Sequence, residues 1–172
     1  MKTIEIRRHS KRFKTDENLS PEGIELAKKI GSQTGPFDLV VTSTIIRAVQ
    51  TAQAMGFKVD KTLDDFSTYG DDVDKEIKFD SGFHEISKAV SKGKHASDYA
   101  KRISKTLSAI ANKMKDDSKV LVISHGGVVE LCVIGCLPNH NFEKLGKSIG
   151  NCEGVRLYHD GEKFVDVEVL RL

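Results

Sequence analysis

The apolar positions of the chain follow two patterns that take turns along the sequence. Short apolar or alternating runs at residues 3–7, 38–42 and 119–124 are typical of strands. The run at 119–124 is apolar at nearly every position, which indicates a strand buried on both faces. Segments with an apolar residue every three or four positions predict helices. These helices are expected at residues 21–30, 45–55, 97–114 and 128–137.

Two regions depart from this alternation. Residues 57–96 hold a candidate short strand at 58–60 and then a stretch rich in Asp, Ser, Thr and Gly, without a sustained period. We treat this segment as an insertion of undefined structure. Near the C-terminus, residues 155–158 and 165–169 alternate on either side of an Asp-Gly turn, which predicts a β-hairpin.

Strands that alternate with helices predict the α/β fold class. We expect a mostly parallel sheet sandwiched between helices, with the C-terminal hairpin adding an antiparallel edge strand. A chain of 172 residues buries roughly two thirds of its unfolded surface in one core. We therefore expect a single domain over residues 1–172.

Composition and charge narrow the classes of partner. The chain has 27 Lys and Arg against 25 Asp and Glu, a balance that favours neither a nucleic-acid nor a membrane partner. Its three cysteines form no CxxC pair, so neither a disulfide framework nor a thiolate metal site is predicted. The first residues lack the apolar stretch of a signal peptide, and we expect a cytoplasmic protein.

Three predicted strands end in side chains suited to one kind of chemistry. The first ends in Arg8 and His9, the second is followed by Arg47 one helical turn on, and the third ends at His125. In a parallel α/β sheet these carboxyl ends share one edge, where ligands of such sheets bind. Two arginines and two histidines should therefore meet in one crevice.

Such a crevice suits a phosphoryl group. A guanidinium group can donate two parallel hydrogen bonds to two phosphate oxygens, and it stays charged at physiological pH. A neutral imidazole can attack phosphorus and form a phosphohistidine, which water then hydrolyses. The arginines supply the positive charge that a metal ion would otherwise bring, so we expect neither a metal nor another cofactor.

Four separated segments resemble the histidine phosphatase superfamily, which contains cofactor-dependent phosphoglycerate mutases, phosphohistidine phosphatases and histidine acid phosphatases. Their order and spacing agree from residue 4 to about residue 137. The segments are Ile6-Arg7-Arg8-His9, Leu19-Ser20-Pro21-Glu22-Gly23, Thr42-Ser43 through Arg47 to Ala52, and Val122-Ile123-Ser124-His125-Gly126-Gly127.

The resemblance implies roles for individual residues. It makes His9 the nucleophile that becomes phosphorylated, and it places Arg8, Arg47 and His125 around the phosphate. Arg12 stands where the acid-phosphatase branch carries a further phosphate-binding arginine. The same resemblance implies a small phosphorylated substrate or a phosphoprotein as the partner, and the sequence leaves the oligomeric state open.

Two positions depart from the pattern of the family. Ser10 replaces the usual glycine after the nucleophile, and its hydroxyl either tightens the loop or points into the pocket. The family's general acid is commonly a glutamate in "L-x-E", where this chain has Asp65. The competing acids are Asp64, Asp71, Asp72 and Glu85.

Together these observations predict a metal-independent phosphatase that acts on phosphomonoesters or phosphohistidine through a phosphohistidine on His9. A phosphoglycerate-type mutase is the nearest alternative. The short segment after residue 56 favours the phosphatase, because a mutase needs a lid that shields its phosphoenzyme from water. A non-catalytic phosphate-binding module is the alternative from another class.

Overall fold

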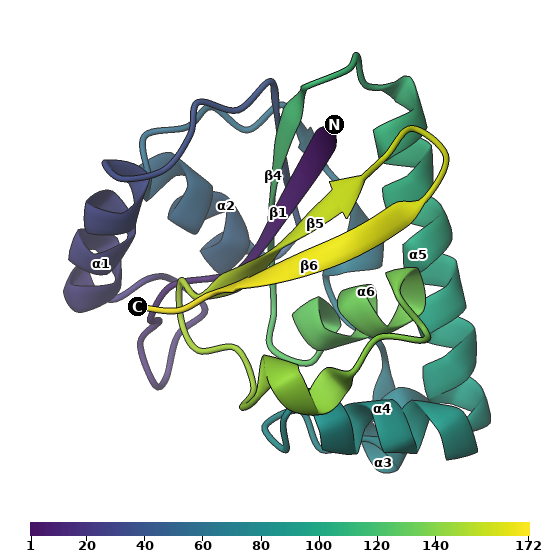
Figure 1. The fold of residues 1–172 in the computed structure, drawn as a ribbon. Coiled ribbons are helices and arrows are strands. Elements are labelled where there is room, and N and C mark those ends of the chain that lie inside the picture. The colour runs from purple at the N-terminus through teal and green to yellow at the C-terminus, as the bar shows by residue number, and fades with distance from the viewer.

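A computed structural model describes all residues 1–172 (Figure 1). The strands are β1 (Lys2–Arg8), β2 (Leu39–Thr42), β3 (Lys61–Thr62), β4 (Lys119–Ser124), β5 (Gly154–His159) and β6 (Phe164–Leu170). The helices are α1 (Pro21–Gly31), α2 (Ile46–Ala54), α3 (Asp71–Glu76), α4 (Phe83–Lys92), α5 (Lys94–Lys113) and α6 (Val128–Cys136), with 3-10 turns η1 (Asp64–Phe66) and η2 (Phe142–Leu145). None of the helices combines the length and apolar character that crossing a membrane requires.

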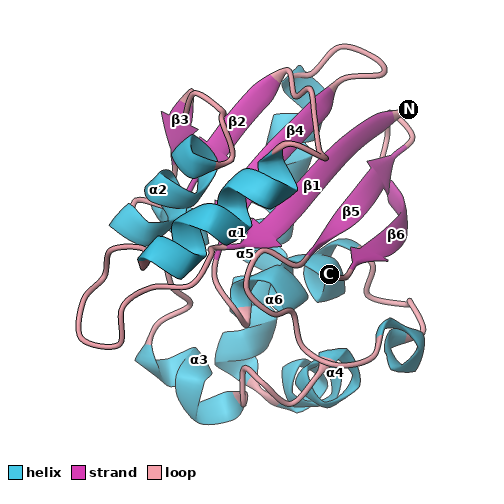
Figure 2. Cartoon of the chain, turned by 90° about the vertical axis from the view of Figure 1, so that its left-hand side faces the viewer, coloured by secondary structure: helices cyan, strands magenta, loops and turns pink.

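The six strands form one sheet in the order β3-β2-β4-β1-β5-β6. The first four strands run parallel, whereas β5 and β6 are antiparallel to their neighbours. Helices cover both faces of this sheet, as Figures 1 and 2 show. The predicted α/β class, with a mostly parallel sheet and an antiparallel C-terminal hairpin, is confirmed.

The burial of β4 explains its unbroken apolar sequence. Val120 and Val122 face the core that α5 and α6 cover, whereas Leu121 and Ile123 face the core under α1 and α2. Successive side chains of a strand point to opposite faces, and here both faces are buried. In Figure 2 the helices α1 and α2 lie in front of the sheet, with α5 and α6 behind it.

The segment 57–96 is an ordered region that holds β3, η1, α3, α4 and the start of α5. Its short strand lies at Lys61–Thr62 rather than at the predicted 58–60. Asp60 exchanges hydrogen bonds with Val40, donating to its carbonyl at 2.9 Å and accepting from its N–H through a carboxylate oxygen at 2.8 Å. Asp60 therefore docks the chain onto β2, and the strand ladder starts only after it.

The strand register places the ends of β1, β2 and β4 side by side. Arg8 lies opposite Ser124, and Thr42 lies opposite Ile123. The ladder continues one residue further, because His9 N–H donates to the Ser124 carbonyl at 2.8 Å. The residues that follow these three strands therefore emerge at one edge of the sheet.

Candidate active site

Arg47 joins the two histidines at this edge. Its Nε donates to His9 Nε2 at 3.0 Å, and its Nη2 donates to His125 Nδ1 at 3.1 Å. The centroids of the two imidazole rings lie 5.1 Å apart. Arg47 projects from the first turn of α2, so the three side chains come from three separate segments of the chain. The predicted convergence of His9, Arg47 and His125 is thus observed.

The hydrogen-bond partners define the tautomers of both imidazoles. His9 Nδ1 lies 2.7 Å from the Ser10 carbonyl, which only accepts, so Nδ1 carries the proton and Nε2 the lone pair. His125 Nδ1 accepts from Arg47, so Nε2 carries the proton and donates to the Ser43 hydroxyl at 2.7 Å. The lone pair of His9 therefore points toward the guanidinium.

Both imidazoles are neutral at physiological pH. Burial, with smaller contributions from the charges of Arg47, Arg8 and Arg12, lowers the pKa of His9 to about 4. Burial likewise lowers the pKa of His125 to about 3, with further contributions from His9 and the neighbouring arginines. A neutral imidazole is the form in which nitrogen is nucleophilic.

Arg8 is the second guanidinium at this edge, and the chain around it leaves one donor free. Its Nη1 donates to the Ile149 carbonyl at 3.0 Å, and Phe79 lies 5.9 Å from its Cζ. Its buried Nε has no hydrogen-bond partner. A buried donor without a partner is rare in proteins, and an anionic ligand would satisfy it. Asn151 supports the neighbouring turn by donating to the His9 carbonyl at 3.0 Å.

Glu130 is a structural element of the site that the sequence patterns did not indicate. It is completely buried in the apolar helix α6, where burial raises the pKa of its carboxyl group. Its two oxygens accept from Gly127 N–H and Ile149 N–H, both at 2.8 Å. Glu130 thereby ties the turn after His125 to the loop that holds Arg8. The only signal in the sequence is one acid within an apolar run.

Ser10 tightens the loop after His9. Its hydroxyl donates to the Gly23 carbonyl at 2.7 Å, and its N–H donates to Thr51 at 2.9 Å. The hydroxyl therefore binds α1 and does not enter the pocket. The close approach also explains Gly23, because a Cβ there would overlap the Lys11 carbonyl.

The segment 57–96 forms a wall beside the cluster. A cavity of about 310 Å³ has Arg47 and His125 on one side and residues 67–71 with Asp74 on the other. Tyr69 donates to Asp74 at 3.2 Å, and burial raises the pKa of this phenol to about 12. Asp71, at the N-terminal end of α3, is exposed and lines the same cavity.

The structure does not bring Asp65 into this cavity. Its carboxylate accepts from the Thr106 hydroxyl of α5 at 2.6 Å, because the 3-10 turn η1 directs it to that helix. The other candidate acids outside the cavity have partners of their own, with Asp64 bound by Thr44, Asp72 by Lys75 and Glu85 by Lys88. Among the acids that the sequence offered, only Asp71 lines the cavity with His125.

Arg12 lies near the cluster, since its charge helps to lower the pKa of both His9 and Arg47. Burial is the largest cause of the lowered pKa of Arg47, followed by Arg12 and Arg8. Three guanidinium groups thus surround two neutral imidazoles. The arrangement is electropositive and is suited to an anion with several oxygens.

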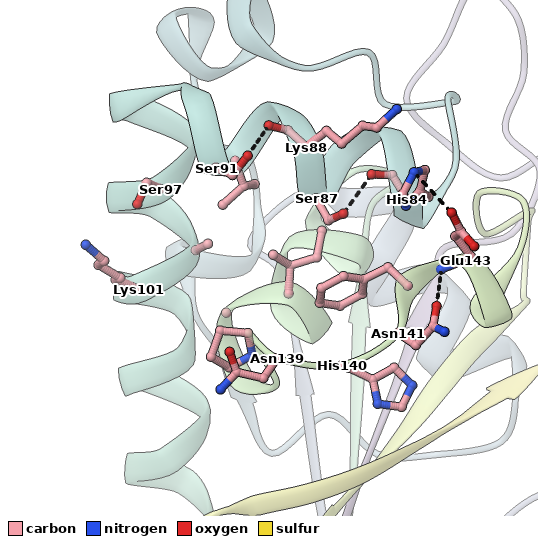
Figure 3. Close-up of a pocket in the computed structure, with 16 residues that line it drawn as sticks. His84, Ser87, Lys88, Ser91, Ser97, Lys101, Asn139, His140, Asn141 and Glu143 are labelled. Carbon is pink, nitrogen blue, oxygen red and sulfur yellow. Dashed lines mark hydrogen bonds and ion pairs between the residues drawn. The ribbon is translucent and has the colours of Figure 1, made fainter.

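A larger hollow of about 830 Å³ lies elsewhere, between α4, α5 and the chain after α6 (Figure 3). It shares no residue with the cluster. Its polar groups are engaged locally, with Ser87 donating to the His84 carbonyl at 2.7 Å and His84 lying 3.5 Å from Glu143. In Figure 3 these side chains lie along the rim of the hollow and do not converge on one point.

The fold and the cluster together define an α/β domain with an electropositive cluster at the carboxyl ends of its parallel strands, the edge where ligands of such sheets bind. The chain belongs to the histidine phosphatase superfamily (branch 1), whose family model matches residues 5–169. This superfamily comprises phosphatases and mutases. A search of curated proteins found no match.

Solved structures share the fold over nearly the whole chain. Phosphoserine phosphatase from Entamoeba histolytica, bound to 3-phosphoglyceric acid, is 16% identical with a TM-score of 0.74, covering 100% of this chain and 98% of that one. Phosphoglycerate mutase from Bacillus anthracis is 16% identical with a TM-score of 0.68, covering 98% and 92%. The protein histidine phosphatase SixA, bound to tungstate, is 18% identical with a TM-score of 0.58, covering 97% and 96%.

Proposed function

We propose that the protein is a phosphatase that transfers a phosphoryl group from its substrate to His9 Nε2 and then to water, without a metal ion. The observation that carries this proposal is the bridge that Arg47 forms between the two neutral imidazoles. It directs the lone pair of His9 toward the group that would hold the phosphate. The substrate is a small phosphomonoester or a phosphohistidine of a protein.

In the first step, phosphate oxygens take the place of the present partners of the Arg47 guanidinium, which frees the lone pair of His9 Nε2. Arg8 offers its free Nε to the same group. Nε2 of His9 then attacks phosphorus and a P–N bond forms, while the bond to the leaving group breaks, which is an oxygen in a phosphomonoester and an imidazole nitrogen in a phosphohistidine. The Ser10 carbonyl accepts the Nδ1–H of His9 throughout, so it stabilises the positive charge on the phosphorylated ring.

Asp71 is the proposed proton donor to the leaving oxygen. It lines the cavity beside His125 and Arg47, where the other acid, Asp74, accepts a hydrogen bond from Tyr69. In the second step the Asp71 carboxylate accepts a proton from the attacking water, the P–N bond breaks, and neutral His9 and inorganic phosphate result. Thr68 and Asp71 are exposed to solvent, which favours hydrolysis over transfer to a second sugar or acid, as in a mutase.

The test is phosphate release from p-nitrophenyl phosphate, phosphoserine, sugar phosphates, phosphoglycerates and a phosphohistidine protein, with a chelator present. Wild type is expected to release phosphate, and His9→Ala is expected to lose the activity. His84→Ala is the matched control, because His84 lies in the separate hollow. Unchanged hydrolysis by His9→Ala would contradict the mechanism. Phosphate binding without release would favour a non-catalytic module.

A further inference from the structure

The loop between β1 and α1 places a carboxylate on the arginines of the site. Glu17 forms an ion pair with Arg47 Nη1, and its other oxygen lies 3.8 Å from Arg12 Nη1. The side chain of Arg47 is only 17% exposed, whereas that of Glu17 is 56% exposed. The carboxylate therefore reaches Arg47 from the solvent side.

A hydrogen-bonded turn holds Glu17 in this position. Phe13 N–H donates to the Asn18 carbonyl at 3.0 Å, and Asn18 donates to the Asp16 carboxylate through its N–H at 2.8 Å and its Nδ2 at 2.6 Å. Gln50, one turn after Arg47 on α2, clamps the end of the loop. Its Nε2 donates to Asn18 at 2.7 Å, and its Oε1 accepts from Leu19 N–H at 2.8 Å. The helix that carries Arg47 thus also fixes the loop that carries Glu17.

All three nitrogens of the Arg47 guanidinium are engaged in this state. Nε and Nη2 donate to His9 and His125, and Nη1 pairs with Glu17. A guanidinium fork binds carboxylate and phosphate oxygens in the same geometry. A phosphate that takes Arg47 as its ligand therefore competes directly with the Glu17 carboxylate.

We propose that Glu17 is an internal anion that competes with the phosphoryl group for Arg47 and Arg12, and that it sets the affinity of the site for phosphate. This inference rests on the proposed role of Arg47 as a phosphate ligand. With Glu17 in place, the guanidinium groups of Arg47 and Arg12 have an anionic partner while the site is empty. The bound phosphate product must then hold Arg47 against a tethered carboxylate, which favours its release.

The test is a calorimetric titration of inorganic phosphate into wild type, Glu17→Gln and Glu22→Gln. Glu22 is the matched control, because it is an exposed carboxylate on α1 that pairs with Lys11. Glu17→Gln is expected to bind phosphate about 10-fold more tightly, within the range of coupling between two ligands that share a site. Glu22→Gln is expected to bind like wild type. The gain should shrink at high salt, because the Glu17 charge is partly exposed.

Glu17→Ala separates competition from support of the loop. Competition predicts tighter phosphate binding in both Glu17 variants, together with stronger inhibition of turnover by phosphate. Unchanged or weaker binding in both variants would overturn the proposal and would make Glu17 a residue that merely orients Arg47. The titration does not need turnover, so a protein that binds phosphate but hydrolyses nothing would refute the proposed function alone.

Discussion

The candidate active site has two halves with different origins in the chain. One half, formed by Arg8, His9, Arg47 and His125, follows the ends of three sheet strands and the first turn of a helix. The other half is the wall formed by residues 67–71 and Asp74, between the second and fifth helices. The first half is fixed by the sheet register, with both histidines buried and both arginines half-buried, whereas the wall is largely exposed. This difference suggests that the sheet edge supplies the phosphoryl chemistry and the wall selects the leaving group.

Removal of the Arg47 side chain should have the largest effect on activity, because Arg47 belongs to the sheet-edge half of the site. Arg47→Ala deletes the donor that bridges both histidines, and kcat/KM is expected to fall about 10³-fold, as for loss of one preorganised charge donor. Arg47→Lys keeps the positive charge but loses the forked pair of donors, so it should recover only a small part of the lost kcat/KM. Steady-state kinetics with p-nitrophenyl phosphate measures both. Wild-type activity in Arg47→Ala would contradict the assignment of the chemistry to the sheet edge.

A change in the wall should matter less and should depend on the substrate. Asp71→Asn is expected to lower kcat about 10²-fold for an alkyl phosphate, whose leaving oxygen needs a proton. With p-nitrophenyl phosphate it should leave the first burst of p-nitrophenol nearly unaffected and slow only the steady rate, because Asp71 also activates the water of the second step. The matched variant is Asp65→Asn, whose carboxylate faces Thr106. An equal loss in the two variants, or a loss in Asp65→Asn alone, would contradict the assignment of the proton donor.

The smallest effect concerns stability and pH. The folded-state pKa values of His9 and His125, about 4 and 3, lie below the ordinary histidine value. Between about pH 6.5 and 4 the unfolded chain binds protons that the folded chain does not, so acidification through this window lowers the free energy of unfolding. The slope is at most about 1.4 kcal/mol per pH unit for each imidazole. Urea denaturation at pH 7, 6 and 5 measures it.

The control for this effect is His9→Gln, which should show a shallower loss of stability on acidification. A wild-type stability that is flat from pH 7 to pH 5, or that rises, would contradict the lowered pKa values. The same result would mean that His9 is not held neutral by burial and neighbouring charge.

The sequence predicted the sheet-edge half because that half follows from topology. Parallel strands have their carboxyl ends at one edge, so Arg8-His9 and Ser124-His125 had to meet once the strands were recognised. Arg47 followed because one helical turn separates it from the end of its strand. No side-chain direction was needed for these three assignments.

The wall and its acid were not assigned from the sequence, because their positions depend on side-chain directions that residue spacing does not encode. Asp65 stands at the family's position in the chain, but a 3-10 turn directs it to Thr106. Helix α4 was missed although Phe83, Ile86 and Val90 have helical spacing, because it follows a Gly-rich stretch without a side-chain cap. Glu17 lies in an exposed polar loop, and only the Gln50 clamp on that loop marks its position.

The central claim is that phosphorus becomes bonded to His9 Nε2. The direct measurement is rapid quench of wild type into alkaline denaturant during turnover of a ³²P-labelled phosphomonoester, followed by peptide mapping at alkaline pH. ³¹P NMR of enzyme trapped in the same way with unlabelled substrate gives the position of the P–N bond. The account predicts an acid-labile label on His9 with the P–N bond at Nε2, and no label in His9→Ala. Steady turnover without a labelled enzyme, or a label on another residue, would contradict it.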